Sequence, residues 1–363
     1  MSSLRDHKNR ILIGAGQMWA VKSARVTIVA AGVVVFIVLS FSIWIFLWPN
    51  WFSGPPERVI HVARGDTFNR VTDSLYTNGI IRSKQAFKIA GRMLGLSREL
   101  KVGRYSFPSG LSNLTILYAL RDGTSRKLIP VSLPEGIRMT FVAGRLGKEL
   151  GVDSTRIMDL CTDSSLVAAW GISAPSLEGY LLPDTYFFHW QTEELSVVER
   201  FLQAFREFYS DSLLERQRQL GMSTHQVVTF ASIVERETQM PWERAVVAGV
   251  YHNRLARGMR LEADPTIQYV LPDGPRRLMY SDLRIESAYN TYRIRGLPPG
   301  PIGNPGRDAI LASLYPERHE YLYFVADGTG GHRFSKSYSE HLRAVREYRR
   351  VRREMQRQAN AGG

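Results

Sequence analysis

The chain has 363 residues, a formal net charge of +13 at pH 7 and one cysteine. This length accommodates about two domains with buried cores, and the ordinary apolar content of 44% argues against wholesale disorder. Because Cys161 is alone, an intrachain disulfide and a thiolate metal cage are both excluded. The eight histidines form no His-Glu-x-x-His motif, and there is no Gly-x-Ser-x-Gly elbow. We therefore expect no metal and no cofactor, and carboxylates remain as the candidate catalytic groups.

One apolar run without charges covers residues 26–48. It is long enough to cross a bilayer as a single helix, and no convincing Ala-x-Ala cleavage site follows it, so we expect an uncleaved anchor. The preceding residues 1–25 are basic, which predicts a cytoplasmic tail and places the chain beyond about residue 52 outside the membrane. These features are typical of a single-pass protein of a bacterial inner membrane with its main domains in the periplasm. The basic residues of the tail are Arg5, Lys8, Arg10, Lys22 and Arg25.

The segment after the anchor predicts a small α+β module. Residues 49–56, with one glycine and three prolines, are expected to form a stiff linker. An apolar strand at 59–62, a turn containing Gly65 and Asp66, and a helix from residue 68 follow in order. We expect this module to extend over residues 57–126.

The same order of strand, glycine turn and helix returns at residues 128–133, 134–136 and 141–150. It opens a second region, residues 127–345, that we expect to be a mixed α+β domain. The fold class predicted for the whole chain is therefore α+β with one transmembrane anchor.

Further elements of this domain are predicted from periodicity and from turn residues. Residues 161–176 are expected to be an irregular connector, and residues 296–306 an ordered loop rich in Gly and Pro. A strand at 321–326 leads into a hairpin turn at 327–332. The amphipathic helices are predicted at residues 197–220, 224–238 and 242–257.

The helix expected at residues 224–238 carries two candidate catalytic carboxyl groups. Its apolar residues recur with helical spacing, which predicts one buried face. At about 100° per residue, Glu235 and Glu237 lie at opposite edges of that face and Arg236 points away from it. Partial burial at such an edge raises a carboxyl pKa, as a general acid requires. Two solvated glutamates on the helix flank are the alternative reading of this segment.

Aromatic residues accompany carboxylates between residues 177 and 188, a combination found in sugar-binding sites. The polar inventory also contains Asp264, Asn290 and Tyr292. It suits cleavage of a glycosidic bond, in which a protonated carboxyl group gives its proton to the leaving oxygen. The arginine-rich tail, residues 346–363, is expected to be a solvated helix or to bind anionic lipid or wall polymer; outside the membrane we expect no nucleic acid.

Short motifs follow one another in a fixed order along the second region. They are residues 231–238 (ASIVERET), 253–255 (NRL), 258–261 (GMRL), 264–266 (DPT), 289–292 (YNTY), 296–302 (GLPPGPI), 304–306 (NPG) and 323–326 (YFVA). This set resembles the endolytic murein transglycosylases, also called YceG-like proteins. Through Gly65, Asp66 and Thr67 the first module resembles the glycan-binding LysM module.

The resemblance implies a peptidoglycan lytic transglycosylase. Such an enzyme cuts the β-1,4 bond between N-acetylmuramic acid and N-acetylglucosamine in nascent strands, leaves 1,6-anhydro ends and terminates strand elongation. The implied partners are glycan strands and glycan synthases of the penicillin-binding class.

By the same resemblance the catalytic acid and base falls on Glu235. Glu237 is then structural and paired with an arginine. Glu262 departs from the glutamine expected at its position, which puts in doubt a role for that side chain in substrate binding. The implied substrate-binding residues are Glu178, Tyr180, Asp264, Asn290, Thr291 and Tyr292.

Two other functions remain open from the sequence. A catalytically silent glycan-binding scaffold would use the same aromatic groove without a tuned acid. A hydrolase would need a second carboxylate, such as Asp264, to activate water.

Overall fold

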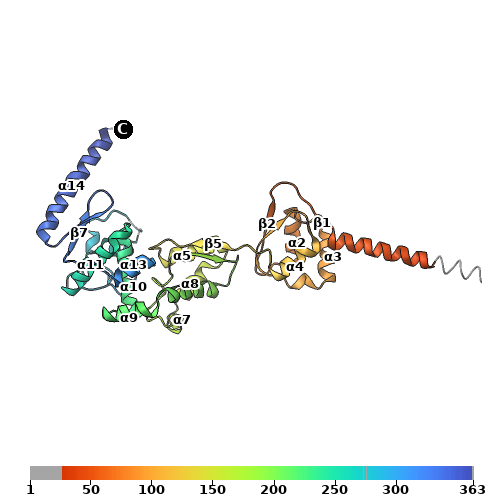
Figure 1. Cartoon of the computed structure of the whole chain (residues 1–363), viewed down its shortest axis with the longest axis horizontal. Coiled ribbons are helices and arrows are strands. Elements are labelled where there is room, and N and C mark those ends of the chain that lie inside the picture. The colour runs from red at the N-terminus through yellow and green to blue at the C-terminus, as the bar shows by residue number, and fades with distance from the viewer. Residues whose placement is uncertain (1–26, 273, 275, 362–363) are drawn as a thin grey trace, which may run out of the picture. The chain divides into compact units, whose positions relative to one another are not determined.

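The computed structural model describes residues 27–361 except 273 and 275, with side chains described as far as residue 354 in the last helix. The basic residues predicted to form the cytoplasmic tail lie outside this range. Contacts divide the described chain into two compact units (Figure 1). Unit 1 runs as far as Leu128 and includes His189–Gln191, and unit 2 contains Ile129–Phe188 and the chain from Thr192 onward.

The apolar run forms one helix, Thr27–Leu47, which is long and apolar enough to cross a membrane and is almost entirely uncovered by the rest of the chain. Its last turn, η1 (Ile43–Leu47), has π-helical geometry. There Ile45 is buried in the hydrophobic core of unit 1, and the Asn113 side-chain amide donates a hydrogen bond to its carbonyl oxygen. The end of this helix is thus part of unit 1.

Unit 1 is a small α+β module built on one antiparallel strand pair. Strand β2 pairs along its whole length with β3, and two helices, α2 and α3, connect them. Side chains of Thr67, Ser83 and Ser112 accept hydrogen bonds from backbone N–H groups in the first turns of α2, α3 and α4, which fixes where each of these helices begins. The elements of this pair and the helices around it are β2 (Glu57–Val62), α2 (Phe68–Thr77), α3 (Lys84–Met93), η2 (Leu96–Arg98), β3 (Gly103–Pro108) and α4 (Asn113–Asp122).

Part of the segment predicted to be a linker is packed against this module. Strand β1 (Pro49–Asn50) pairs with β4 (Leu111–Ser112). Asn50 is buried, and its amide donates to Asn113 and to the Leu111 carbonyl. These hydrogen bonds satisfy a buried polar side chain. They therefore fix the segment that follows the apolar helix to the rest of unit 1.

Unit 2 begins with a strand pair and a layer of helices. Strand β5 (Ile129–Ser132) pairs antiparallel with β6 (Thr185–Phe188). The connector predicted at 161–176 is instead partly helical, because the carboxylates of Asp153 and Asp163 cap the starts of two short helices. The single helix predicted at 197–220 is divided at Tyr209 and Ser210. The helices of this part are α5 (Met139–Leu150), α6 (Ser154–Thr162), α7 (Ser164–Ala169), α8 (Glu194–Phe208) and α9 (Asp211–Gln219).

Helix α10 (Thr224–Glu237) forms the centre of unit 2. A capping box of Ser223 and Gln226 starts it, and every residue from Val227 to Glu235 is buried. Helices α11 and α13 pack against it. The helix predicted at 242–257 begins one residue earlier, at Pro241, with a 3₁₀ turn. The neighbouring elements are η3 (Pro241–Glu243), α11 (Arg244–Ala256), α12 (Asp264–Val270), η4 (Asp282–Arg284) and α13 (Arg307–Leu314).

The Gly/Pro run of residues 296–306 is an ordered loop, as predicted, with no helix or strand. Asn304 is its main anchor. Its side-chain oxygen accepts the backbone N–H groups of Gly179 and Leu181, and its amide donates to the Ile137 carbonyl. One side chain therefore joins three segments that are far apart in the sequence.

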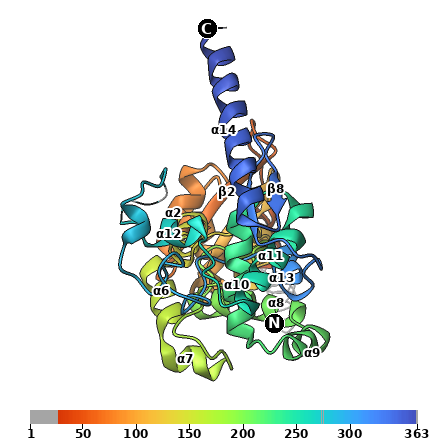
Figure 2. The same cartoon turned by 90° about the vertical axis from the view of Figure 1, so that its left-hand side faces the viewer.

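The chain ends with a hairpin and a long helix. Strand β7 (Tyr323–Ala326) pairs with β8 (His332–Ser335), which confirms the predicted strand and turn. Helix α14 (Tyr338–Ala361) packs its first turns on this hairpin and then leads away from it (Figure 2). Its described arginine side chains are exposed.

Candidate active site

The end of α10 carries both candidate carboxyl groups. Glu235 and Glu237 are two residues apart, so their side chains leave the helix about 200° apart. Each one lines a different cavity. The sequence predicted one buried face with a glutamate at each of its edges. Instead the helix is buried on all sides from Val227 to Glu235, because other elements of unit 2 surround it, and the two carboxyl groups line separate cavities that differ in chemistry.

Glu235 is buried and held by fixed donors. Its two carboxylate oxygens accept from the Arg244 guanidinium at 2.8 Å and from the Gly306 backbone N–H at 2.9 Å. The same Arg244 nitrogen donates to Glu135 at 2.7 Å. Burial raises the pKa of Glu235, whereas Gly306 and Arg244 act to lower it and the Glu135 carboxylate acts to raise it. The adjoining cavity, about 430 Å³, is lined by Glu135, Gly136, Glu235, Arg236, Thr238, Gln239 and Arg244.

Glu237 is in a different environment. Its side chain accepts a hydrogen bond from the phenol of Tyr251, a buried residue of α11. The partner is thus a tyrosine and not the arginine expected from the sequence. Burial raises the pKa of Glu237 to about 7, against the lowering effect of the Tyr251 hydrogen bond. A carboxyl group with such a pKa is substantially protonated at neutral pH.

The cavity beside Glu237 contains two of the predicted substrate-binding residues. Its volume is about 440 Å³. The Tyr292 phenol donates to Asp264 at 2.6 Å, and the Asp264 side chain is exposed. Asp264 also acts to raise the pKa of Glu237, so the two carboxyl groups lie close enough to interact. The lining residues are Glu237, Tyr251, Arg254, Leu261, Glu262, Asp264, Tyr292, Phe324, Val325, Ala326, His332 and His341.

Three other predicted residues are buried and hydrogen-bonded inside the protein. Glu178 accepts from the first backbone N–H of α5 at Met139, and burial raises its pKa to about 7. The Asn290 amide donates to two backbone carbonyls of the preceding loop. The Thr291 hydroxyl accepts the Ala263 N–H. None of these three side chains lines the cavities beside Glu235 and Glu237.

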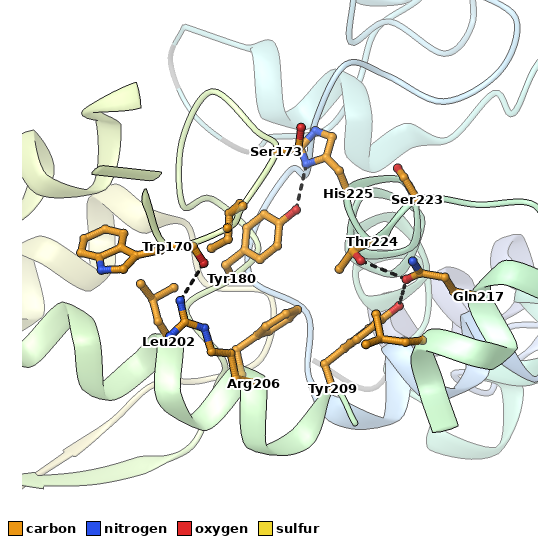
Figure 3. Close-up of a pocket in the computed structure, with 14 residues that line it drawn as sticks. Trp170, Ser173, Tyr180, Leu202, Arg206, Tyr209, Gln217, Ser223, Thr224 and His225 are labelled. Carbon is orange, nitrogen blue, oxygen red and sulfur yellow. Dashed lines mark hydrogen bonds between the residues drawn. The ribbon is translucent and has the colours of Figure 1, made fainter. Parts of the chain in front are cut away.

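Tyr180 lines a third cavity, of about 550 Å³, at the opposite end of α10 (Figure 3). Its phenol lies 3.2 Å from His225 Nδ1, and the other ring nitrogen of His225 contacts the Pro299 carbonyl. Phe205 and Tyr209 complete an aromatic wall. Because this cavity is lined by no carboxyl group, it offers no acid of the kind that glycoside cleavage uses.

Several residues that shape the site escaped the sequence analysis. Tyr251 and Arg244 hold the two glutamates, and Glu135 shares the arginine from 109 positions away. Buried Glu243 accepts bonds from the Thr238 hydroxyl and from the backbone and ring of His332, which ties the β7–β8 hairpin to the end of α10. No local motif marks these residues.

Within the described residues, no group of three or more His, Cys, Asp and Glu side chains is placed to hold a metal ion. Cys161 is buried, and burial raises its thiol pKa to about 12, so it has little thiolate character. The chemistry available at the end of α10 is therefore that of carboxyl groups, phenols and the buried guanidinium groups of Arg244 and Arg254.

Comparison with known proteins places this arrangement in a family. The sequence profile of the YceG-like family matches residues 60–347. The chain is 28% identical over 303 residues to an endolytic murein transglycosylase of Bacillus subtilis, covering 80% of this chain and 84% of the relative. A protein of the same name from Streptococcus pneumoniae is 26% identical over 320 residues, covering 80% of this chain and 58% of that longer protein.

A solved structure agrees with these matches. The crystal structure of a YceG-like protein from Listeria monocytogenes superposes with a TM-score of 0.57 at 28% identity, covering 79% of this chain and 98% of that one. The resemblance seen in the sequence motifs is thereby confirmed. The chain belongs to the YceG-like family.

Proposed function

We propose that this protein is an endolytic murein transglycosylase, a lyase that cuts glycan strands of peptidoglycan. Relatives over most of the chain carry that name. The observation that carries the proposal is Glu237, a partly buried carboxyl group with a pKa of about 7 beside a polar cavity of about 440 Å³. A cavity of this size suits a small portion of a saccharide chain.

We assign the acid and base role to Glu237 in preference to Glu235, the residue expected from the sequence. A general acid must be protonated when substrate binds and must reach the substrate. Glu235 has both oxygens occupied by Arg244 and Gly306, donors that stabilise its ionised form. Glu237 has one phenol donor and retains acceptor capacity toward its cavity. Glu235 then serves to fix the end of α10 through the buried ion pair with Arg244.

The reaction proceeds in two proton transfers at Glu237. The protonated carboxyl group gives its proton to the glycosidic oxygen between N-acetylmuramic acid and N-acetylglucosamine as the C1–O bond breaks. The resulting carboxylate then removes the proton from the 6-hydroxyl group of the same muramic acid, whose oxygen bonds to C1 and closes the 1,6-anhydro ring. Because the attacking hydroxyl belongs to the substrate, its effective concentration is high and no activated water is required. One carboxyl group therefore suffices, and it regains its proton.

Asp264 supports a second candidate reaction at the same site. It lies in the cavity of Glu237 and is held by the Tyr292 phenol, so a second carboxylate is available to activate water. The product would then be a reducing end in place of an anhydro end. Product chemistry separates this hydrolase from the lytic enzyme.

The test is mass spectrometry of purified peptidoglycan digested by the full-length protein in detergent. The full chain is used because the end of the apolar helix packs in unit 1. We expect the wild-type protein to release 1,6-anhydromuramoyl products and Glu237→Gln to release none. Glu235→Gln should release the same products as the wild type, in an amount proportional to its folded fraction. Loss of products in Glu235→Gln with an intact fold and normal yield in Glu237→Gln would reverse the assignment.

Reducing-end products that disappear in Asp264→Asn would establish the hydrolase. Retained binding to peptidoglycan without any cleavage by the wild-type protein would leave only the scaffold function.

We further propose that the Thr27–Leu47 helix is a single-pass anchor in the bacterial inner membrane, with the units beyond it in the periplasm. Unit 1 has the order strand, helix, helix, strand, which supports the LysM-like glycan-binding role proposed for it. An enzyme tethered in this way would cut nascent strands close to the bilayer and terminate their elongation, which makes glycan synthases of the penicillin-binding class its natural partners. Crosslinking in membranes that contain such synthases tests the partnership.

A further inference from the structure

Glu262 has a strained backbone at the rim of the Glu237 cavity. Its φ angle is +51°, in the left-handed region, and it is one of two described residues other than glycine with a positive φ. This conformation costs an L residue about 1 kcal/mol or more. Its side chain is 46% exposed and is part of the cavity lining.

Fixed contacts hold Glu262 in this conformation. Its backbone N–H donates to the Thr291 carbonyl at 3.2 Å. Its carboxylate accepts from Arg254 at 3.2 Å. The adjacent residues Leu261 and Ala263 are buried, so the strained residue is anchored on both sides. A carboxylate kept in place at a backbone cost, beside the proposed acid, points to a role toward substrate.

The charges around the cavity are unevenly exposed. The Arg254 side chain is only 8% exposed, and its nitrogens also donate to the carbonyls of Arg260, Leu261 and Leu322. Arg254 lines the cavity and pairs with Glu262, but its side chain is largely covered and donates to these carbonyls, while the side chains of Glu262 and Asp264 are exposed.

The two histidines of the cavity do not offset this charge. His332 contacts the buried carboxylate of Glu243, which balances any positive charge on its ring. Burial lowers the pKa of His341, which favours its neutral form at neutral pH. The exposed carboxylates of Glu262 and Asp264 thus give the cavity lining a negative charge that the largely covered Arg254 offsets only in part.

We propose that Glu262 makes the enzyme selective for glycan strands that carry a cationic amine, as in an N-deacetylated hexosamine, over fully N-acetylated strands. The proposal rests on the proposed function, because it places the glycan in the Glu237 cavity. An ammonium group on the sugar next to the scissile bond gains a charge interaction with Glu262 that an acetamido group lacks. The carboxylate of Asp264 adds to the same field.

The experiment compares two substrates that differ only in this charge. Glycan strands freed of peptides are partly N-deacetylated on glucosamine, and half of the preparation is chemically re-acetylated. Cleavage by the full-length protein is measured as kcat/KM. Binding is measured by calorimetry with the Glu237→Gln variant, which keeps the shape of the side chain.

We expect the wild-type protein to prefer the amine-bearing strands by about fivefold or more at low salt, as for a close, partly screened charge pair. Glu262→Gln should reduce the ratio to near one, since it removes the charge and retains the size. Glu262→Gly should do the same without folding cost from the backbone, because glycine accepts a positive φ. The matched control is Glu286→Gln, an exposed loop carboxylate outside the cavity, which should leave the ratio unchanged.

Equal kcat/KM and equal binding for the two strands, or a preference that persists in Glu262→Gln, would overturn the proposal. If neither strand is cut, the proposed function fails. The ratio of the two binding affinities, measured in Glu237→Gln with and without the added Glu262→Gln substitution, still decides the role of Glu262.

Discussion

Replacing Glu237 by glutamine should stabilise the protein at alkaline pH. In the native state burial raises the pKa of Glu237 to about 7, from an ordinary value of 4.5. Native protein therefore binds this proton more tightly than unfolded protein does, so stability is lost as pH rises from 4.5 through 7. At about 1.4 kcal/mol per pH unit, the penalty is below about 1 kcal/mol at pH 5 and reaches about 3 kcal/mol at pH 8. Glutamine has no proton to lose and still accepts the Tyr251 hydrogen bond.

The free energy of unfolding is measured by urea titration of the full-length protein in detergent at pH 5 and pH 8, with circular dichroism as the probe. We expect Glu237→Gln to exceed the wild type by about 3 kcal/mol at pH 8 and by under about 1 kcal/mol at pH 5. Glu286→Gln, at an exposed carboxylate, controls for the loss of a negative charge. A raised pKa of Glu237 is refuted if Glu237→Gln is no more stable than the wild type at pH 8, or if its gain in stability is the same at both pH values.

Three further predictions concern residues packed around α10. Tyr251→Phe removes the donor that lowers the pKa of Glu237, so the alkaline limb of the kcat/KM profile should move up by about one pH unit; an unmoved limb would separate Glu237 from the acid role. Arg244→Met leaves buried Glu235 without its ion-pair partner, and urea unfolding should show a loss of about 3–5 kcal/mol that shrinks at acidic pH, where Glu235 is protonated. Gly179 has a φ of +91°, and a methyl group there would lie 2.6 Å from Pro301 and from Val228, so Gly179→Ala should lower the melting temperature. Gly171 has a similar φ with open space around it, so Gly171→Ala should lower the melting temperature less.

Local patterns in the sequence predicted several elements correctly. The apolar run appears as the helix Thr27–Leu47, and the periodic segment from residue 224 appears as α10. The hairpin at β7 and β8 followed from its Gly-rich turn. Each of these depends on residues that are neighbours along the chain, because helix periodicity, turn preference and bilayer-spanning length are local properties.

Boundaries that depend on capping or on packing were less predictable. The connector expected at 161–176 contains helical turns because aspartate side chains satisfy their first N–H groups. The expected linker after residue 48 is partly paired because Asn50 finds its partners about 60 positions later in the chain. Such partners are not visible in a short window of sequence.

That the two glutamates at the end of α10 leave the helix on different sides can be read from the sequence, since each residue adds about 100° of rotation. The groups that each glutamate contacts depend on the folded chain. Arg244 and the Gly306 N–H hold Glu235, whereas Glu237 meets Tyr251 and a cavity that also contains Asp264. A carboxyl pKa depends on burial and on donors brought together from distant segments, and for that reason the choice between the two glutamates required the fold.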